Sequence, residues 1–135
     1  MPALDTNILV RWLVQDDGAQ SDQVEALFRT SIAKRRPLFV PCTVILELEW
    51  VLRSRYGYTK AAVVQGLDAL LDARELEIQF ESAIERALYL YRQSRADFAD
   101  CLHVGLSAEA ERLPFVTFDE RASRLFGAEL LAPLS

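Results

Sequence analysis

Short apolar segments with the composition of β-strands alternate along this chain with longer segments of helical periodicity. The strand-like segments cover residues 38–40, 76–80 and 114–118, Ala3-Leu4 precedes them, and residues 129–131 could close the sheet as an edge strand. Such alternation predicts an α/β fold with a mostly parallel sheet. The helices are expected at residues 8–14, 21–35, 44–55, 59–73, 82–93, 97–112 and 119–126.

Length and charge limit the classes of function that are open to the chain. Its 135 residues, 51% of them hydrophobic, predict a single folded domain over residues 1–135. The formal net charge is -5, whereas proteins that hold nucleic acid by bulk charge are usually basic. Contact with nucleic acid must therefore depend on local basic patches or on metal ions.

Other simple classes lack their sequence features. Cys42 and Cys101 are far apart and there is one histidine, His103, so a zinc site is not expected and helix packing explains the histidine. No apolar run is long enough to cross a bilayer, and no targeting signal is visible. We therefore expect a cytoplasmic protein without a membrane partner.

Acidic residues recur where strands end and helices begin. Asp5 ends the first apolar segment, Asp119 directly follows residues 115–118, and Asp97 and Asp100 open the sixth helix. Each of Asp5, Asp97 and Asp119 could instead be an ordinary helix N-cap, and taken alone that interpretation is favoured. Asp100 differs, because it stands one turn inside a helix with no other charged residue before Glu109 except His103.

Glu47 is the most informative acid of the third helix. Its neighbour Glu49 has Arg53 four residues ahead and is expected to form an ordinary surface pair. Glu47 has no cation on its own helix, so we expect a carboxylate among apolar groups that needs a positive partner. A salt bridge to an arginine elsewhere remains the alternative.

Together these acids predict a metal site. In a parallel α/β sheet the strand ends and the following helix starts meet at one edge, so up to five carboxylates are expected there. Crowded carboxylates repel one another, and a divalent cation relieves the repulsion. Ligands that offer only oxygen suit Mg²⁺ or Mn²⁺, which can make hydroxide from water and stabilise charge on a phosphate.

Four segments, in this order, resemble the motifs of the PIN domain family, and most closely its VapC-type toxins. They are Leu4-Asp5-Thr6-Asn7, Leu46 to Leu52, Asp97-Phe98-Ala99-Asp100-Cys101-Leu102 and Val116-Thr117-Phe118-Asp119. The resemblance implies a three-layer α/β/α domain and a Mg²⁺- or Mn²⁺-dependent endoribonuclease. It gives the roles of the family's acidic quartet to Asp5, Glu47, Asp100 and Asp119, and Asp97 is an additional candidate metal ligand.

The resemblance also implies partners. Members of the family usually form homodimers and are silenced by a cognate antitoxin that binds beside or in the active site. An amphipathic antitoxin segment ending in a basic residue would suit an acidic pocket with apolar walls, for which Trp12 and Leu13 are candidates. Arg11 is a candidate contact for the phosphate of the RNA substrate.

Two other functions compete with this interpretation. A phosphatase with an aspartate nucleophile would need a second aspartate two positions after Asp5, and that position is Asn7. A non-enzymatic interaction module with acids that only cap helices would not be stabilised by divalent metal.

Overall fold

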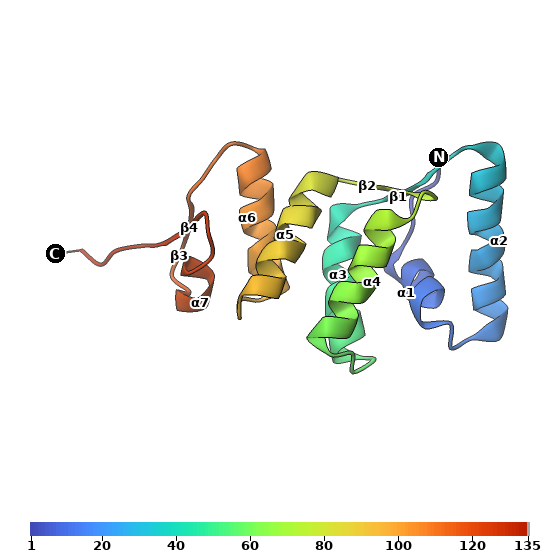
Figure 1. Cartoon of the computed structure of the whole chain (residues 1–135), viewed down its shortest axis with the longest axis horizontal. Coiled ribbons are helices and arrows are strands. Elements are labelled where there is room, and N and C mark those ends of the chain that lie inside the picture. The colour runs from blue at the N-terminus through green and yellow to red at the C-terminus, as the bar shows by residue number, and fades with distance from the viewer. Residues whose placement is uncertain (135) are drawn as a thin grey trace. The chain divides into compact units, whose positions relative to one another are not determined.

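The computed structural model describes residues 1–134, which form two compact units, residues 1–79 and 80–134. We refer to them as the N-terminal unit and the C-terminal unit, and each is described by itself (Figure 1). The prediction of a single domain over residues 1–135 stays a prediction.

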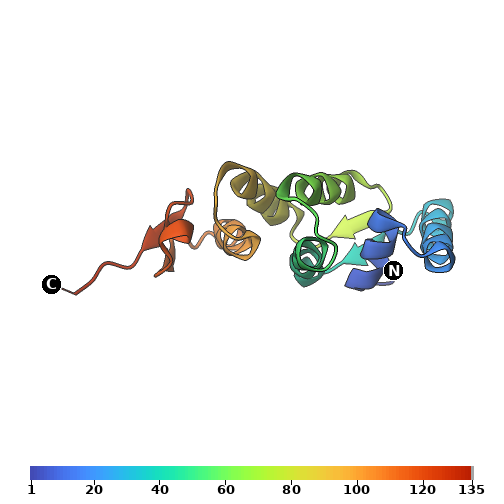
Figure 2. The ribbon, with the colours of Figure 1, turned by 90° about the horizontal axis from the view of Figure 1, so that it is seen from below.

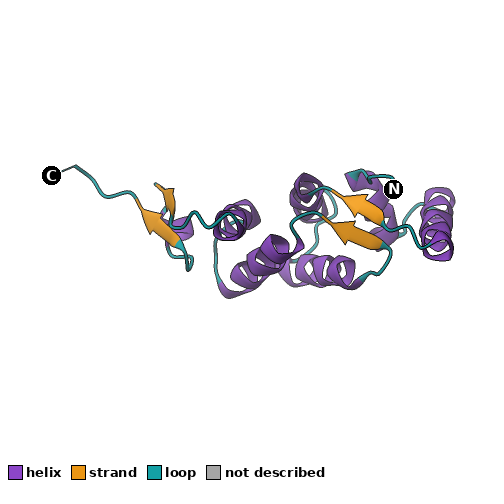
Figure 3. Cartoon of the chain, turned by 90° about the horizontal axis from the view of Figure 1, so that it is seen from above, coloured by secondary structure: helices purple, strands orange, loops and turns teal. Residues whose placement is uncertain are grey.

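The N-terminal unit is built on a short parallel sheet. Strand β1 (Leu38–Val40) pairs in parallel with β2 (Leu76–Ile78), and Figure 3 shows the two arrows pointing the same way. The predicted first strand is reduced to one parallel bridge between Ala3 and Phe39, supported by the hydrogen bond from Leu4 N to Phe39 O at 2.8 Å. Asp5 therefore leaves the sheet at the same end as β1.

Four helices cover this sheet in the N-terminal unit. Helix α1 packs against α2 and α3, α3 packs against α4, and α4 packs against β2. Their core includes Leu9, Phe28, Val40, Leu48 and Leu67, all buried. The helices span Thr6–Val14 (α1), Gly18–Lys34 (α2), Cys42–Ser54 (α3) and Lys60–Asp72 (α4).

Three of these helices begin earlier than the sequence predicted, and α1 starts at Thr6 directly after its N-cap Asp5. Helix α2 starts at Gly18 because the Asp17 side chain caps it by accepting a hydrogen bond from Gln20 N at 3.1 Å. Helix α3 starts at Cys42, with Pro41 at the N-cap position and no side-chain cap. Thr59 caps α4 by accepting a hydrogen bond from Ala62 N at 3.1 Å.

The C-terminal unit combines a helix pair with a second parallel strand pair. Helices α5 (Glu81–Gln93) and α6 (Phe98–Glu109) lie side by side (Figure 2). A Cβ atom added at Gly105 would lie 2.5 Å from Ala83 O, so only glycine permits this close approach. Strands β3 (Phe115–Thr117) and β4 (Ala128–Leu130) pair in parallel across the single-turn helix α7 (Glu120–Ser123).

The predicted α/β class is confirmed. Every predicted helix is present among the described residues, although α7 is shorter than expected and Gly127 takes its positive φ of 99° in the turn before β4. The predicted edge strand at the C-terminus is β4. Among residues 1–134, no helix combines the length and apolar character needed to span a membrane.

Candidate active site

Asp5 and Glu47 are brought together in the N-terminal unit. Asp5 is the N-cap of α1, and its Oδ1 accepts a hydrogen bond from Thr6 N at 2.7 Å. Its second carboxylate oxygen makes no hydrogen bond within the described part of the chain, and the residue is exposed. The capping interpretation of Asp5 is therefore correct, yet the cap leaves one oxygen available to a ligand.

Thr6 joins the two acidic motifs of this unit. Its hydroxyl donates a short hydrogen bond to Glu47 Oε1, and the residue is only 4% exposed. This contact ties the start of α1, which follows the Ala3 bridge, to the second turn of α3, which follows β1. The sequence contained a signal for it, because a threonine sits between an acid and an apolar helix, but we did not predict its role.

The predicted environments of Glu47 and Glu49 are reversed. Glu49 is 3% exposed and accepts a hydrogen bond from Arg53 Nε at 2.8 Å, so it is a buried partner rather than a surface one. It lies on the same face of α3 as the core residues Ile45 and Leu52. Glu47 is exposed, and what holds it is the Thr6 hydroxyl rather than a cation.

Three aspartates line one pocket in the C-terminal unit. The cavity has a volume of about 370 Å³ and is lined by Asp97, Asp100, Asp119, Glu120 and Arg121. Glu120 and Arg121 were not predicted, although a second acid directly after Asp119 could have been noticed. The pocket gathers acids that come from α6 and from the end of β3.

The capping roles of the three aspartates differ. Asp97 occupies the N-cap position of α6 but makes no capping hydrogen bond with its side chain, contrary to the capping interpretation. Asp119 caps α7 by accepting a hydrogen bond from Ala122 N at 3.0 Å. Asp100 lies in the first turn of α6 and is partly buried. Asp97 and Asp100 thus keep their carboxylates for the pocket.

The electrostatics of this pocket disfavour charge on Asp100. Burial raises the pKa of Asp100, the carboxylates of Asp119 and Asp97 raise it further, and His103 opposes them. When folding raises the pKa of an acid, the protonated acid stabilises the folded state at low pH. That stabilisation is lost as the pH rises through the folded-state pKa. A bound cation would remove this cost. His103 itself is exposed and stacks on Phe115, with the ring centroids 5.5 Å apart.

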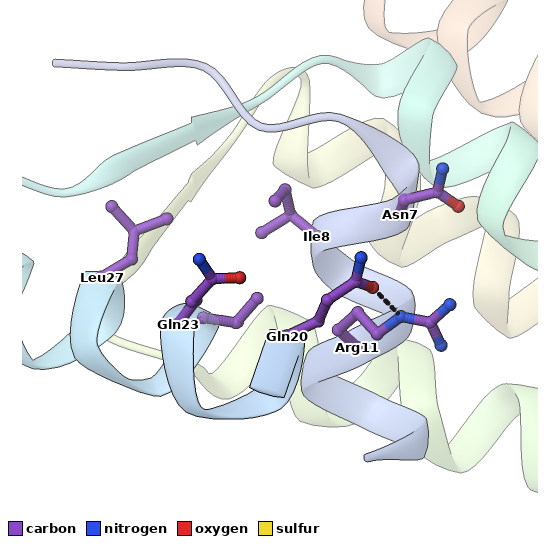
Figure 4. A pocket seen from close by; sticks show the side chains of 7 residues that line it. Asn7, Ile8, Arg11, Gln20, Gln23 and Leu27 are labelled. Carbon is purple, nitrogen blue, oxygen red and sulfur yellow. Dashed lines mark hydrogen bonds between the residues drawn. The ribbon is translucent and has the colours of Figure 1, made fainter. Parts of the chain in front are cut away.

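A second cavity lies beside Asp5, between α1 and α2. Its volume is about 350 Å³, and its lining includes Asn7 and Ile8 of α1 and Gln20, Gln23 and Leu27 of α2; Figure 4 shows Ile8 directed toward α2. Arg11 and Val24 complete the lining. The lining of the cavity therefore combines apolar side chains with side-chain amides.

Arg11 and the expected wall residues have other roles. Arg11 donates to Gln20 Oε1 at 2.6 Å and to Asp16 Oδ1 at 2.5 Å, and its contact with Tyr56 raises its pKa most. Trp12 stacks on Phe28, with the ring centroids 5.2 Å apart, and Leu13 lies next to Gly66 of α4. Trp12 and Leu13 are thus not among the residues that line the cavity beside Asp5.

Comparison with known proteins identifies the family. The family model described as PIN domain matches residues 3–126. The chain belongs to the PIN domain family. It is 27% identical over 128 residues to a VapC ribonuclease of Aquifex aeolicus (strain VF5), covering 93% of this chain and 92% of that protein. The predicted relationship to VapC-type PIN proteins is confirmed, and with it the α/β class.

The structure thus places the predicted acids in two groups. Asp5 and Glu47 meet through Thr6 in the N-terminal unit, and Asp97, Asp100 and Asp119 share a pocket in the C-terminal unit. Within residues 1–134, no three His, Cys, Asp or Glu side chains form a ready-made metal cluster. The roles of these residues as catalytic groups or metal ligands stay a prediction.

The reversed environments of Glu47 and Glu49 predict separate effects on stability. Glu49→Gln should lower the free energy of unfolding by about 1–3 kcal/mol, because it weakens a buried charge-assisted hydrogen bond. Glu47→Gln should change it by less than about 0.5 kcal/mol, because the amide oxygen still accepts from Thr6 and the residue is exposed. Urea unfolding of both variants checks this, and equal losses would contradict the observed burial.

Proposed function

We propose that this chain is a Mg²⁺- or Mn²⁺-dependent endoribonuclease and the toxin of a toxin–antitoxin pair. Membership of the PIN domain family and the VapC ribonuclease relative support an RNA-cleaving hydrolase. In this proposal Asp5, Glu47, Asp100 and Asp119 are the catalytic carboxylates and metal ligands, and Asp97 is a further metal ligand. The observation that carries it is the position of Asp5, Glu47 and Asp119. Each lies at or near the start of a helix that follows a strand or the Ala3 bridge.

The donor set fits a hard divalent cation. All the proposed ligands are carboxylates, and oxygen ligands suit Mg²⁺ and Mn²⁺ better than zinc. Burial and the neighbouring aspartates raise the pKa of Asp100, and a divalent cation in the pocket would offset both effects. Two further oxygen ligands are available for a metal ion. They are the second carboxylate oxygen of Asp5 and the carboxylate of Asp97, which does not cap α6.

The residues of the chain divide the work of the reaction. A bound divalent ion supplies a nucleophile from water and offsets the charge that develops on the scissile phosphate. Thr6 holds the Glu47 carboxylate in place through its hydroxyl. Arg121 lines the aspartate pocket and is a better candidate for phosphate contact than Arg11, whose guanidinium is occupied by Asp16 and Gln20.

The competing functions have less support. The phosphatase interpretation still lacks its second aspartate, since Asn7 lines the cavity between α1 and α2. The interaction-module interpretation is favoured by the caps that Asp5 and Asp119 form, but it does not explain why Asp97 leaves its own helix uncapped.

Substitution of Asp5 tests the proposed function. Asp5→Asn should lower the rate of RNA cleavage by more than about 100-fold, since even residues that only orient metal ligands are worth 10–100-fold. The protein should stay folded, because the amide can still cap α1. Cleavage of RNA in Mg²⁺ or Mn²⁺, followed on a gel, gives the rates.

Two controls accompany that experiment. Asp22→Asn removes an exposed aspartate of α2 outside both acidic groups and should leave the rate unchanged. Excess EDTA should stop wild-type cleavage without unfolding the chain. Wild-type rates for Asp5→Asn, or full activity in EDTA, would show that the proposed site is wrong.

The cavity between α1 and α2 supports a docking place for the antitoxin. Its apolar residues Ile8, Val24 and Leu27 can receive the apolar face of an antitoxin helix beside Asp5. A basic residue following that stripe, most suitably arginine with its two-pronged donor set, would then reach the acids. We propose that this residue occupies the place of the metal.

The proposed docking predicts two dependences of antitoxin affinity. Leu27→Asp should weaken binding at least tenfold, whereas Ala26→Asp, on the same helix but outside the cavity, should not. High Mn²⁺ should also weaken binding by competing for the acids. Affinities that neither Mn²⁺ nor Leu27→Asp changes would place the antitoxin elsewhere.

The remaining parts of the proposal rest on the resemblance alone. They are a homodimer, whose mass light scattering would give, and a site of action in the cytoplasm, where RNA substrates and a co-expressed antitoxin would meet the enzyme. Cell fractionation checks the second.

A further inference from the structure

Three arginines surround a further cavity, which lies in the N-terminal unit. Its volume is about 330 Å³, and its lining includes Arg35 and Arg36 at the C-terminal end of α2 and Arg74 in the turn before β2. Figure 1 shows these two chain segments next to the start of β1. We refer to Arg35, Arg36 and Arg74 as the arginine cradle. Ser31, Ile32, Pro37 and Glu75 complete the lining.

Within the described residues, the guanidinium groups of the arginine cradle are not paired with carboxylates. None of the three guanidinium groups forms a salt bridge there, although the Glu75 carboxylate lines the same cavity. The end of α2 is closed by backbone groups instead, through hydrogen bonds from Arg35 N to Ile32 O at 3.1 Å and from Arg36 N to Ser31 O at 3.0 Å. The guanidinium groups are therefore available to a ligand from outside.

The helix dipole explains only part of this cluster. Cations are favoured in the last turn of a helix, which accounts for Lys34, Arg35 and Arg36. It does not account for Arg74, which comes from a different segment and closes the other side of the cavity. Arg35 also takes the left-handed conformation, with φ at 52°, where glycine is the ordinary choice. The chain thus keeps an arginine where the backbone alone would prefer glycine.

The arginine cradle lies at the amino ends of the strands, whereas Asp5 and Glu47 lie beyond their carboxyl ends. Residues 35–37 lead into the first residue of β1, and Arg74 precedes the first residue of β2. Asp5 and α3 follow the other ends of the strands. A ligand of the arginine cradle is therefore separate from the group that reacts at the acids.

We propose that the arginine cradle binds the phosphate backbone of the RNA substrate at a distance from the cleaved bond. This inference rests on the proposed function. A chain with a net charge of -5 and an acidic site repels a polyanion, so the affinity must come from local cations. Arginine fits phosphate oxygens with paired donors, and three of them around one cavity can follow successive phosphates.

Salt dependence of RNA binding tests this inference. Binding is measured in EDTA on the Asp5→Asn protein, so that no cleavage occurs and the result does not depend on metal. Each phosphate contact to a single strand contributes about 0.7 to the slope of log affinity against log salt. Arg36→Gln with Arg74→Gln should therefore reduce the slope by about 1.4 and weaken binding at low salt.

A matched variant and a glycine variant complete the design. Arg86→Gln with Arg95→Gln removes the same charge from exposed positions of the other unit and should leave the slope unchanged. Arg35→Gly removes one guanidinium while giving the left-handed position its preferred residue, so RNA binding should fall without loss of thermal stability. Loss of binding with retained stability separates a ligand contact from damage to the fold.

Three outcomes would overturn the inference. One is an unchanged slope in the arginine cradle variants. Another is displacement of the RNA by inorganic phosphate beyond the effect of chloride at equal ionic strength, which would assign the cavity to free phosphate. The third is a loss of antitoxin affinity in these variants with RNA binding intact. If cleavage proves independent of Asp5 while the slope still falls, the proposed catalytic site fails and the RNA contact stands.

Discussion

A buried threonine hydroxyl connects the two acidic motifs of the N-terminal unit. Thr6 caps nothing itself, since Asp5 performs that role, and its side chain is free to donate to Glu47. The contact depends on α1 and α3 packing against each other, which the apolar faces of both helices provide. The position of Glu47 is thus a consequence of core packing beneath it, and Asp5 keeps an open oxygen beside it.

The aspartates at helix starts differ in whether their side chains cap the helix. This difference separates acids with a structural role from acids whose carboxylates are available to a ligand. A capping aspartate satisfies backbone donors at a helix start, as Asp17 does at the start of α2. Asp5 and Asp119 also cap, but each sits at the end of a β-bridged or β-strand segment. Asp97 and Asp100 do not cap with their side chains and share a pocket with Asp119, whose charge raises the pKa of Asp100 after the larger effect of burial.

The sequence predicted the elements better than the surroundings of their side chains. Strand and helix periodicity located β1, α3 and the acids at their ends, because those signals are local. The burial of Glu49 was missed because the pairing with Arg53 looks the same on a surface and over a core, and only the packing of Ile45, Leu48 and Leu52 decides between them. The wall residues of the cavity between α1 and α2 were also predicted wrongly. Trp12 was expected to line it, but its ring stacks on Phe28.

The central claim is that the acids at the helix starts bind the divalent metal that the proposed ribonuclease needs, and Mn²⁺ binding measured by calorimetry tests it most directly. Asp5→Asn and Asp119→Asn should each weaken Mn²⁺ binding at least tenfold, or about 1.4 kcal/mol, while Asp22→Asn should leave it unchanged. Wild-type Mn²⁺ affinity in either Asp5→Asn or Asp119→Asn would contradict the role of that residue as a metal ligand.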